Sequence, residues 1–147
     1  FVAMMNAEAK EIGATGSHFV NANGLHDENH YTTAYDLCLI FQAAMQYDDF
    51  MEIIQQKEYT ATYTASDGSA IEATWSSSNK FTSGAVTVPD GVQAVGGKTG
   101  TTTAARSCLV QLFTDAQGQR YVAIILGCKE RGILYEEMQS FLSNLNN

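Results

Sequence analysis

The sequence is poor in proline, cysteine and basic residues, and it has no long apolar run. The single proline, Pro89, lies in an expected loop, and no repeat or low-complexity tract is present in the 147 residues. Eight Lys and Arg residues stand against sixteen Asp and Glu residues, a net charge of −8. Nucleic acids and anionic membrane surfaces attract clustered basic side chains, so we expect neither as a partner. No apolar stretch approaches the roughly 20 residues that span a bilayer.

The three cysteines show no Cys-x-x-Cys spacing, which disfavours a structural zinc site. Cys38 falls on the apolar stripe of an expected helix and is interpreted as core. Cys108 and Cys128 lie on neighbouring expected strands, where a disulfide is conceivable, but we favour buried free thiols. His26 and His30 have the spacing of a helical metal pair, yet the surrounding Gly and Asn residues disfavour a helix there. We therefore expect no metal and no cofactor.

What the chain does contain is enough apolar sequence for one folded domain. Hydrophobic residues make up 45% and charged residues 16% of the chain. The first residues, from Phe1, already follow a helical pattern without a start methionine or signal-peptide pattern, which suggests a piece of a longer protein.

Apolar spacing predicts helices first, then strands, then a final helix, which together indicate an α+β fold with an antiparallel sheet. Four expected inward positions on the final helix are Met138, Phe141, Leu142 and Leu145. Met4 and Met5 are expected in the core, and Trp75 is expected to pack on the sheet. The expected helices are 1–12, 31–46, 48–59 and 136–145, and the expected strands are 59–65, 69–75, 91–102, 107–115 and 120–128.

The tripeptide Lys98-Thr99-Gly100 is the strongest chemical signal. Alone it is weak, but here it ends an expected strand, follows two glycines and precedes a hairpin of two strong strands. At a sheet edge, the Lys ammonium and the Thr hydroxyl can hold a substrate carboxylate. Gly100 keeps the strand surface flat, so a peptide can lie along it as an added strand. The backbone N–H of Thr101 can point at a developing oxyanion.

This motif, with "FVAMMNAEAKEIGATGSHFVNANGLHDENHYTTAYDLCLI", "KTGTTTAARSCLVQLF" and "RYVAIILGC", resembles the serine-type D-alanyl-D-alanine carboxypeptidases. These enzymes are the low-molecular-weight penicillin-binding proteins, and the resemblance covers nearly the whole chain. It implies a partial penicillin-binding-protein fold and a role for residues 1–147 as the C-terminal part of the transpeptidase-like domain. It also implies a parent enzyme that removes the terminal D-alanine from peptidoglycan stem peptides and binds β-lactams.

The family's Ser-x-x-Lys and Ser-x-Asn motifs are expected before Phe1, so this chain carries the substrate strand without its nucleophile. A decoy, Ser77-Ser78-Asn79-Lys80, satisfies both patterns literally. A working Ser-x-x-Lys opens a buried helix with its Lys one turn from the Ser. Ser77 instead follows an expected strand, and the family has a structural Asn-containing turn at this place.

Two further residues are candidates by resemblance. Arg106 stands where the family usually has glycine, and it either assists carboxylate binding or is solvated. His30 matches a family His before a helix start, where it either braces the loop or supports catalysis.

The resemblance implies that Lys98 acts in catalysis, and that Lys98, Thr99, Gly100 and Thr101 form the substrate site. It also implies an extracytoplasmic location in a bacterium. Two alternatives remain: a class A β-lactamase-like hydrolase, and a non-catalytic module that binds peptidoglycan or a protein partner. Without its N-terminal half, the chain is expected to present "RYVAIILGC" as an unpaired edge. We expect it to self-associate, by edge pairing or by swapping an element, or to be only marginally stable.

Overall fold

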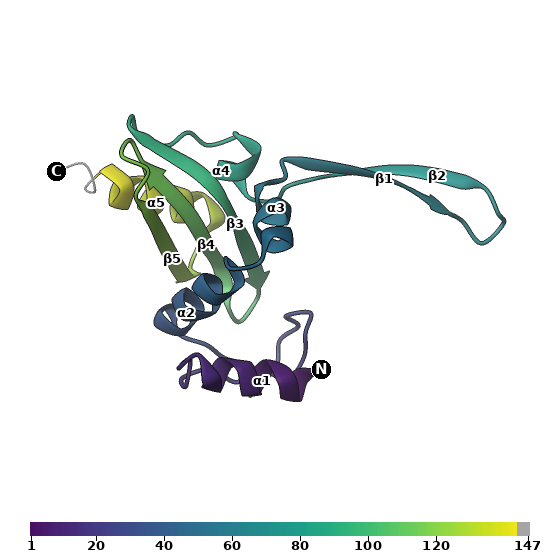
Figure 1. The fold of residues 1–147 in the computed structure, drawn as a ribbon, viewed down its shortest axis with the longest axis horizontal. Helices are drawn as coiled ribbons and strands as arrows, with labels where there is room; N and C mark the ends of the chain where they lie inside the picture. The colour runs from purple at the N-terminus through teal and green to yellow at the C-terminus, as the bar shows by residue number, and fades with distance from the viewer. Residues whose placement is uncertain (144–147) are drawn as a thin grey trace.

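The computed structural model describes residues 1–143 and confirms the expected α+β class (Figure 1). The elements in chain order are α1 (Val2–Glu11), α2 (Ala34–Ala44), α3 (Asp48–Gln55), β1 (Glu58–Thr64), β2 (Ala70–Ser76), α4 (Lys80–Ser83), β3 (Val92–Thr102), β4 (Arg106–Asp115), β5 (Arg120–Cys128) and α5 (Arg131–Ser143). They form two antiparallel sheets, the hairpin β1-β2 and a three-stranded sheet in the order β3-β4-β5.

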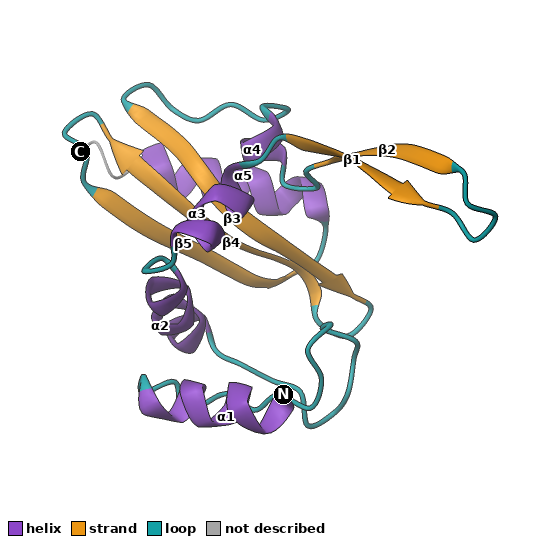
Figure 2. Ribbon diagram, turned by 45° about the vertical axis from the view of Figure 1, so that its right-hand side comes forward, coloured by secondary structure: helices purple, strands orange, loops and turns teal. Residues whose placement is uncertain are grey.

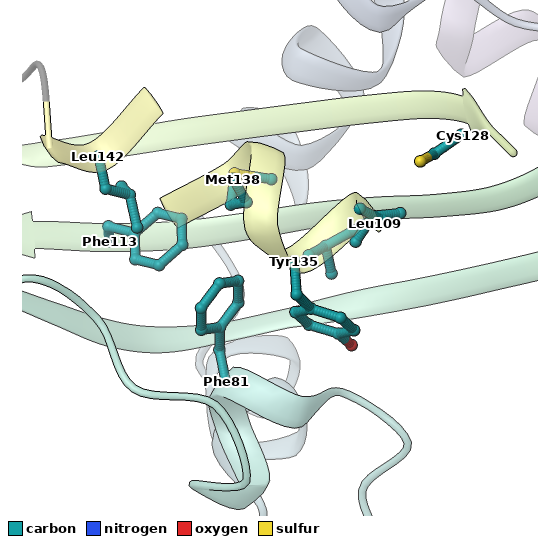
Figure 3. Packing of buried hydrophobic residues seen from close by; sticks show 8 residues of the cluster. Phe81, Leu109, Phe113, Cys128, Tyr135, Met138 and Leu142 are labelled. Atoms are coloured by element: carbon teal, nitrogen blue, oxygen red, sulfur yellow. The ribbon is translucent and has the colours of Figure 1, made fainter. Parts of the chain in front are cut away.

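The three-stranded sheet is covered on both faces, because side chains along β4 alternate between two apolar clusters. Leu109 and Phe113 belong to the cluster formed with α5, and Val110 and Leu112 to the cluster formed with α2 and α3. Figure 2 shows α5 on one face of the sheet and α3 on the other. The cluster on the α5 face consists of Phe81, Leu109, Phe113, Cys128, Leu134, Tyr135, Met138 and Leu142 (Figure 3). Burial of these apolar side chains stabilises the packing of α5 on the sheet.

Helix α2 starts where the sequence supplies a cap. The Thr33 hydroxyl accepts a hydrogen bond from the Asp36 backbone N–H at 3.1 Å, which satisfies one of the free donors of the first turn. Asp36 is itself buried, and its carboxylate accepts a 2.7 Å bond from the Ser17 hydroxyl. The loop before α2 is thereby fixed to the helix start.

The hairpin β1-β2 projects away from the rest of the chain (Figure 1). Tyr59 pairs with Trp75 and Tyr63 with Ile71, so four large apolar side chains share one face of the hairpin. Trp75 is 54% exposed, so the expectation that it packs on the sheet is wrong. A two-stranded hairpin has no second layer to cover it, which is why its apolar face remains open.

Three other expectations from helical spacing need correction. Phe141 is 63% exposed, because α5 turns only Leu134, Tyr135, Met138 and Leu142 fully inward. Met4 is 70% exposed and Met5 half-buried, since α1 lies beyond α2 and away from the sheet (Figure 2). Cys38 is half-buried, and the expected position of Leu145 lies outside the described residues.

Element boundaries also differ from the expected ones in two places. Helix α5 begins at Arg131 instead of 136, and α3 ends at Gln55 so that β1 can start at Glu58. The short helix α4 was not expected. It begins because the Asn79 side chain caps it by accepting the Phe81 N–H at 3.1 Å. Among the described residues, no helix is both long and apolar enough to cross a bilayer.

Strand β5 is an edge of the sheet, as expected, and its residues Val122, Ile124 and Ile125 are only partly buried. An apolar edge strand offers unpaired backbone groups to another chain. We predict that the isolated 147-residue chain self-associates at micromolar concentration, with a mass in sedimentation that rises with concentration. A concentration-independent monomer with a cooperative, high-temperature melt would contradict this prediction.

Candidate active site

Lys98 and Thr99 lie on β3, at the edge of the sheet opposite β5. In the register, Lys98 lies opposite Val110 and Thr99 opposite Leu109, so their side chains emerge on opposite faces of the sheet. Lys98 is exposed and on the face shared with α2 and α3. Its ammonium donates a hydrogen bond to the Thr99 carbonyl oxygen at 2.5 Å. The charge is therefore available at the surface.

Two glycines before Lys98 allow α3 and β4 to approach the strand closely. A Cβ atom at Gly96 would lie 2.6 Å from the Ile54 carbonyl oxygen, at the end of α3. A Cβ atom at Gly97 would collide with the Val110 carbonyl oxygen of β4. At Gly100, in contrast, an added Cβ would meet nothing within 4 Å. Close packing within the chain explains Gly96 and Gly97. Gly100 has no such neighbour, and it forms open surface beside Lys98.

The Thr99 hydroxyl is held by a neighbouring loop. Ser78 Oγ lies 2.7 Å from Thr99 Oγ1, and the Ser78 carbonyl oxygen accepts a hydrogen bond from the Arg131 guanidinium. Arg131 is exposed at the start of α5. The fold thus brings a second cation to the neighbourhood of Thr99. Sequence reasoning missed it, because no short motif connects Arg131 with the Lys-Thr-Gly strand.

The decoy motif does not form a Ser–Lys pair. Asn79 is 2% exposed, and its amide donates to Gln111 Oε1 at 2.5 Å. Lys80 is the first residue of α4, and its ammonium lies 5.5 Å from the centre of the Tyr135 ring. Ser77 precedes that helix and accepts from the Asn79 N–H at 3.3 Å. This geometry is that of a structural turn and argues against Ser77 as a nucleophile.

Arg106 has φ +58°, in the left-handed region that favours glycine. It closes the short hairpin loop between β3 and β4, where the Ala105 N–H donates to Thr102 Oγ1 at 2.9 Å. Three-residue hairpin loops commonly place a left-handed residue at this point. The left-handed backbone explains why the family that this chain resembles usually has glycine at the position of Arg106. The Arg106 side chain is exposed and does not line the described cavities beside Lys98.

His30 is part of the loop that precedes α2. Its Nδ1 accepts a hydrogen bond from the Val20 N–H at 3.2 Å, and its ring meets Phe19 edge-on with centroids 5.6 Å apart. The loop-bracing interpretation fits these contacts, and His30 does not line the described cavities beside Lys98. Among residues 1–143 no group of three or more His, Cys, Asp or Glu side chains is placed to hold a metal ion.

All three cysteines are free thiols; Cys128 is buried as expected, but Cys108 is only half-buried. Cys108 Sγ donates to the Ala105 carbonyl oxygen and Cys128 Sγ to the Glu130 carbonyl oxygen, each at 3.3 Å. Neither sulfur is directed at the other, so these neighbouring strands are not cross-linked.

A shifted pKa lies away from Lys98, in the turn between β4 and β5. Desolvation acts to raise the pKa of Asp115, but hydrogen bonds outweigh it and hold that pKa below its usual value. The carboxylate accepts from the backbone N–H groups of Gln119 and Gln117, at 2.8 and 2.9 Å, and from the Tyr121 hydroxyl at 2.9 Å. These bonds stabilise the hairpin turn.

Two cavities flank the Lys-Thr-Gly strand. One, of about 600 Å³, lies between Lys98, Thr99, the end of α3 and the base of the β1-β2 hairpin. The other, of about 290 Å³, lies between Lys98, Gly100, Cys108 and helix α2. A cation and a hydroxyl at a free strand edge between two cavities can bind a carboxylate and align an extended peptide. The Lys-Thr-Gly motif at its centre is one that penicillin-binding proteins and β-lactamases carry.

Comparison with known proteins identifies the family of the chain. The family model for D-alanyl-D-alanine carboxypeptidases (peptidase family S11) matches residues 1–130, and the chain belongs to that family. The D-alanyl-D-alanine carboxypeptidase DacF of Bacillus subtilis is 30% identical over 96% of this chain and 34% of its own length. The D-alanyl-D-alanine carboxypeptidase of Streptomyces sp. strain K15 is 32% identical over 83% of this chain and 40% of its own length.

Solved structures give the same result. The Streptomyces K15 DD-transpeptidase superposes with a TM-score of 0.80 at 28% identity, over 95% of this chain and 50% of that one. A D-alanyl-D-alanine carboxypeptidase from Mycobacterium tuberculosis superposes with a TM-score of 0.76 at 29% identity, over 97% and 51%. The chain therefore spans between a third and about half of the length of these relatives.

Proposed function

We propose that this chain is the C-terminal part of a serine D-Ala-D-Ala carboxypeptidase that acts on peptidoglycan stem peptides through an acyl-enzyme, outside the cytoplasm. The observation that carries the proposal is the position of Lys98 and Thr99 on a free edge strand between two cavities. In this proposal the nucleophilic serine and its lysine base lie outside these 147 residues, and the structural turn that holds Ser77 supports it.

Lys98, Thr99 and Thr101 of β3, together with Arg131 of α5, have roles in this proposal. The Lys98 ammonium binds the terminal carboxylate of the peptide and raises the positive potential around the nucleophile. The Thr99 hydroxyl, held by Ser78, borders the same cavity as Lys98 at the strand edge and shares that carboxylate there. Arg131, bonded to the Ser78 carbonyl at the start of α5, adds a second positive charge on the Thr99 side of the strand. The Thr101 N–H contributes to the oxyanion hole, and a β-lactam occupies the same positions as the peptide.

The experiment compares the isolated 147-residue chain with the full-length protein on a peptide that ends in D-Ala-D-Ala. We predict release of D-alanine by the full-length protein and none by the chain alone, because the chain has no serine placed for acylation. The variant Ser77→Ala in the full-length protein should keep its activity. Turnover by the isolated chain that disappears on Ser77→Ala would show that the decoy is the nucleophile.

The same assay separates the two alternatives. A β-lactamase-like hydrolase would turn over penicillin rapidly and leave the peptide intact. A non-catalytic module would bind peptidoglycan or a partner without releasing D-alanine and without forming a covalent penicillin adduct.

A further inference from the structure

The loop of residues 77–79 connects β2 to α4 and contacts the three-stranded sheet through two consecutive side chains. Ser78 Oγ lies 2.7 Å from Thr99 Oγ1 on β3. The amide of the next residue, Asn79, donates a hydrogen bond to Gln111 Oε1 on β4 at 2.5 Å. The loop is therefore bonded both to the strand that carries Thr99 and to the strand beside it.

The contact between Asn79 and Gln111 is buried and fixes the loop. Asn79 is 2% exposed, and Gln111 is fully buried. Gln111 lies opposite Gly97 in the register, and a Cβ atom at Gly97 would lie 2.6 Å from Gln111 Oε1. The Asn79 side-chain oxygen also accepts from the Phe81 N–H at 3.1 Å and so caps α4. Because these contacts lie in the interior of the described chain, the described residues alone determine the position of Ser78.

The contact between Ser78 and Thr99 determines where the Thr99 hydroxyl proton points, and this step rests on the proposed function. A threonine hydroxyl has one proton and two lone pairs, whereas an ionised carboxylate can only accept hydrogen bonds. Thr99 can therefore bind the terminal carboxylate of the peptide only by donating its proton. The bond with Ser78 then has the Ser78 hydroxyl as donor and Thr99 Oγ1 as acceptor. A hydroxyl that accepts one hydrogen bond is polarised, and it donates a stronger one.

We propose that Ser78 is a positioning residue of the substrate-carboxylate site and acts on the substrate through Thr99. Its hydroxyl donates to Thr99 Oγ1, holds the Thr99 side chain in one rotamer, and leaves the Thr99 proton for the carboxylate of the peptide. The buried pair Asn79 and Gln111 holds the side-chain end of the loop for this bond. Arg131 holds its backbone, because the guanidinium donates to the Ser78 carbonyl oxygen.

The test is a double-mutant cycle in the full-length protein, with D-alanine released from an acetylated peptide that ends in D-Ala-D-Ala as the readout. Ser78 is exposed, so Ser78→Ala is expected to fold. We expect this variant to lower kcat/KM by about threefold to tenfold, the range for one hydrogen bond. In a Thr99→Val background, which keeps the shape of the side chain without its hydroxyl, the same change should lower kcat/KM by less than about twofold. An equal fall in both backgrounds means that Ser78 acts on the loop or directly on the substrate, and it overturns the proposal.

Two further variants separate the hydroxyl of Ser78 from a general effect on the loop. Ser78→Thr retains a hydroxyl donor and should restore most of the activity that Ser78→Ala loses. Ser77→Ala is the matched control, because the Ser77 hydroxyl accepts from the Asn79 N–H and has no recorded bond to Thr99; kcat/KM should stay unchanged. A Ser78→Thr variant no more active than Ser78→Ala, or an equal loss in Ser77→Ala, contradicts the role of Ser78. Wild-type activity in Ser78→Ala overturns this proposal alone, whereas failure of the unmodified protein to release D-alanine overturns the proposed function.

Discussion

Replacing Lys98 with alanine in the full-length protein is expected to lower both acylation by penicillin and hydrolysis of D-Ala-D-Ala peptides by a factor of about 30 to 1,000. The reason is the loss of a charge-assisted contact to the substrate carboxylate, which typically contributes ~2–4 kcal/mol. The Lys98 ammonium has no carboxylate partner among the described residues and bonds only to the adjacent Thr99 carbonyl, so it is free to bind an anion. Stopped-flow acylation and steady-state turnover measure the two effects.

Lys10→Ala serves as the control for a general charge effect. Lys10 is exposed in the last turn of α1, on a helix that lies away from the sheet (Figure 2). Its removal changes the net charge by the same amount and should leave both rates unaltered. If Lys98→Ala stays within about threefold of the wild type, Lys98 does not bind the reacting substrate.

Gly96→Ala is expected to destabilise the protein by about 1–3 kcal/mol, the usual cost of overpacking a well-packed region. The new methyl group would lie 2.6 Å from the Ile54 carbonyl oxygen and 2.9 Å from Ile54 Cγ1, so α3 must move away from β3. Urea unfolding of the variant and the wild type measures the difference in free energy.

Gly100→Ala provides the matched control, because it adds the same methyl group to the same strand. There the new Cβ meets nothing within 4 Å, and we expect the free energy of unfolding to change by no more than about 0.5 kcal/mol. An equal loss of unfolding free energy in the two variants would mean that the backbone of β3 itself disfavours a side chain at both positions. The close approach of α3 would then not explain Gly96.

The strands could be predicted to within a residue or two, because their period is strict and their turns are marked. β4 and β5 flank a turn in which Asp115 accepts two backbone bonds and Gly118 takes φ +80°. The helix boundaries were harder to predict from the sequence. Gly132 interrupts the helical pattern of α5, yet the buried Leu134 and Tyr135 extend that helix back to Arg131. Packing on the sheet decides this boundary, and local propensity does not.

Part of the candidate site could also be predicted from the sequence, and part could not. Lys98, Thr99 and Gly100 are adjacent in sequence, so their pattern could be recognised directly. Arg131 reaches Thr99 only through Ser78, a contact between segments far apart in the chain. Trp75 reaches the cavity only because the hairpin register places it opposite Tyr59 at the hairpin base. Such contacts depend on the tertiary fold, and no local spacing indicates them.

The most direct test of the proposed function is the position of the serine that penicillin acylates. The full-length protein is labelled with a fluorescent penicillin, digested, and the adduct is located by tandem mass spectrometry. We predict one labelled serine, in a Ser-x-x-Lys sequence outside residues 1–147, and loss of labelling in Lys98→Ala. An adduct on Ser77 or Ser78, or no adduct with an intact and folded protein, would contradict the assignment of this chain as the substrate-binding part of a serine carboxypeptidase.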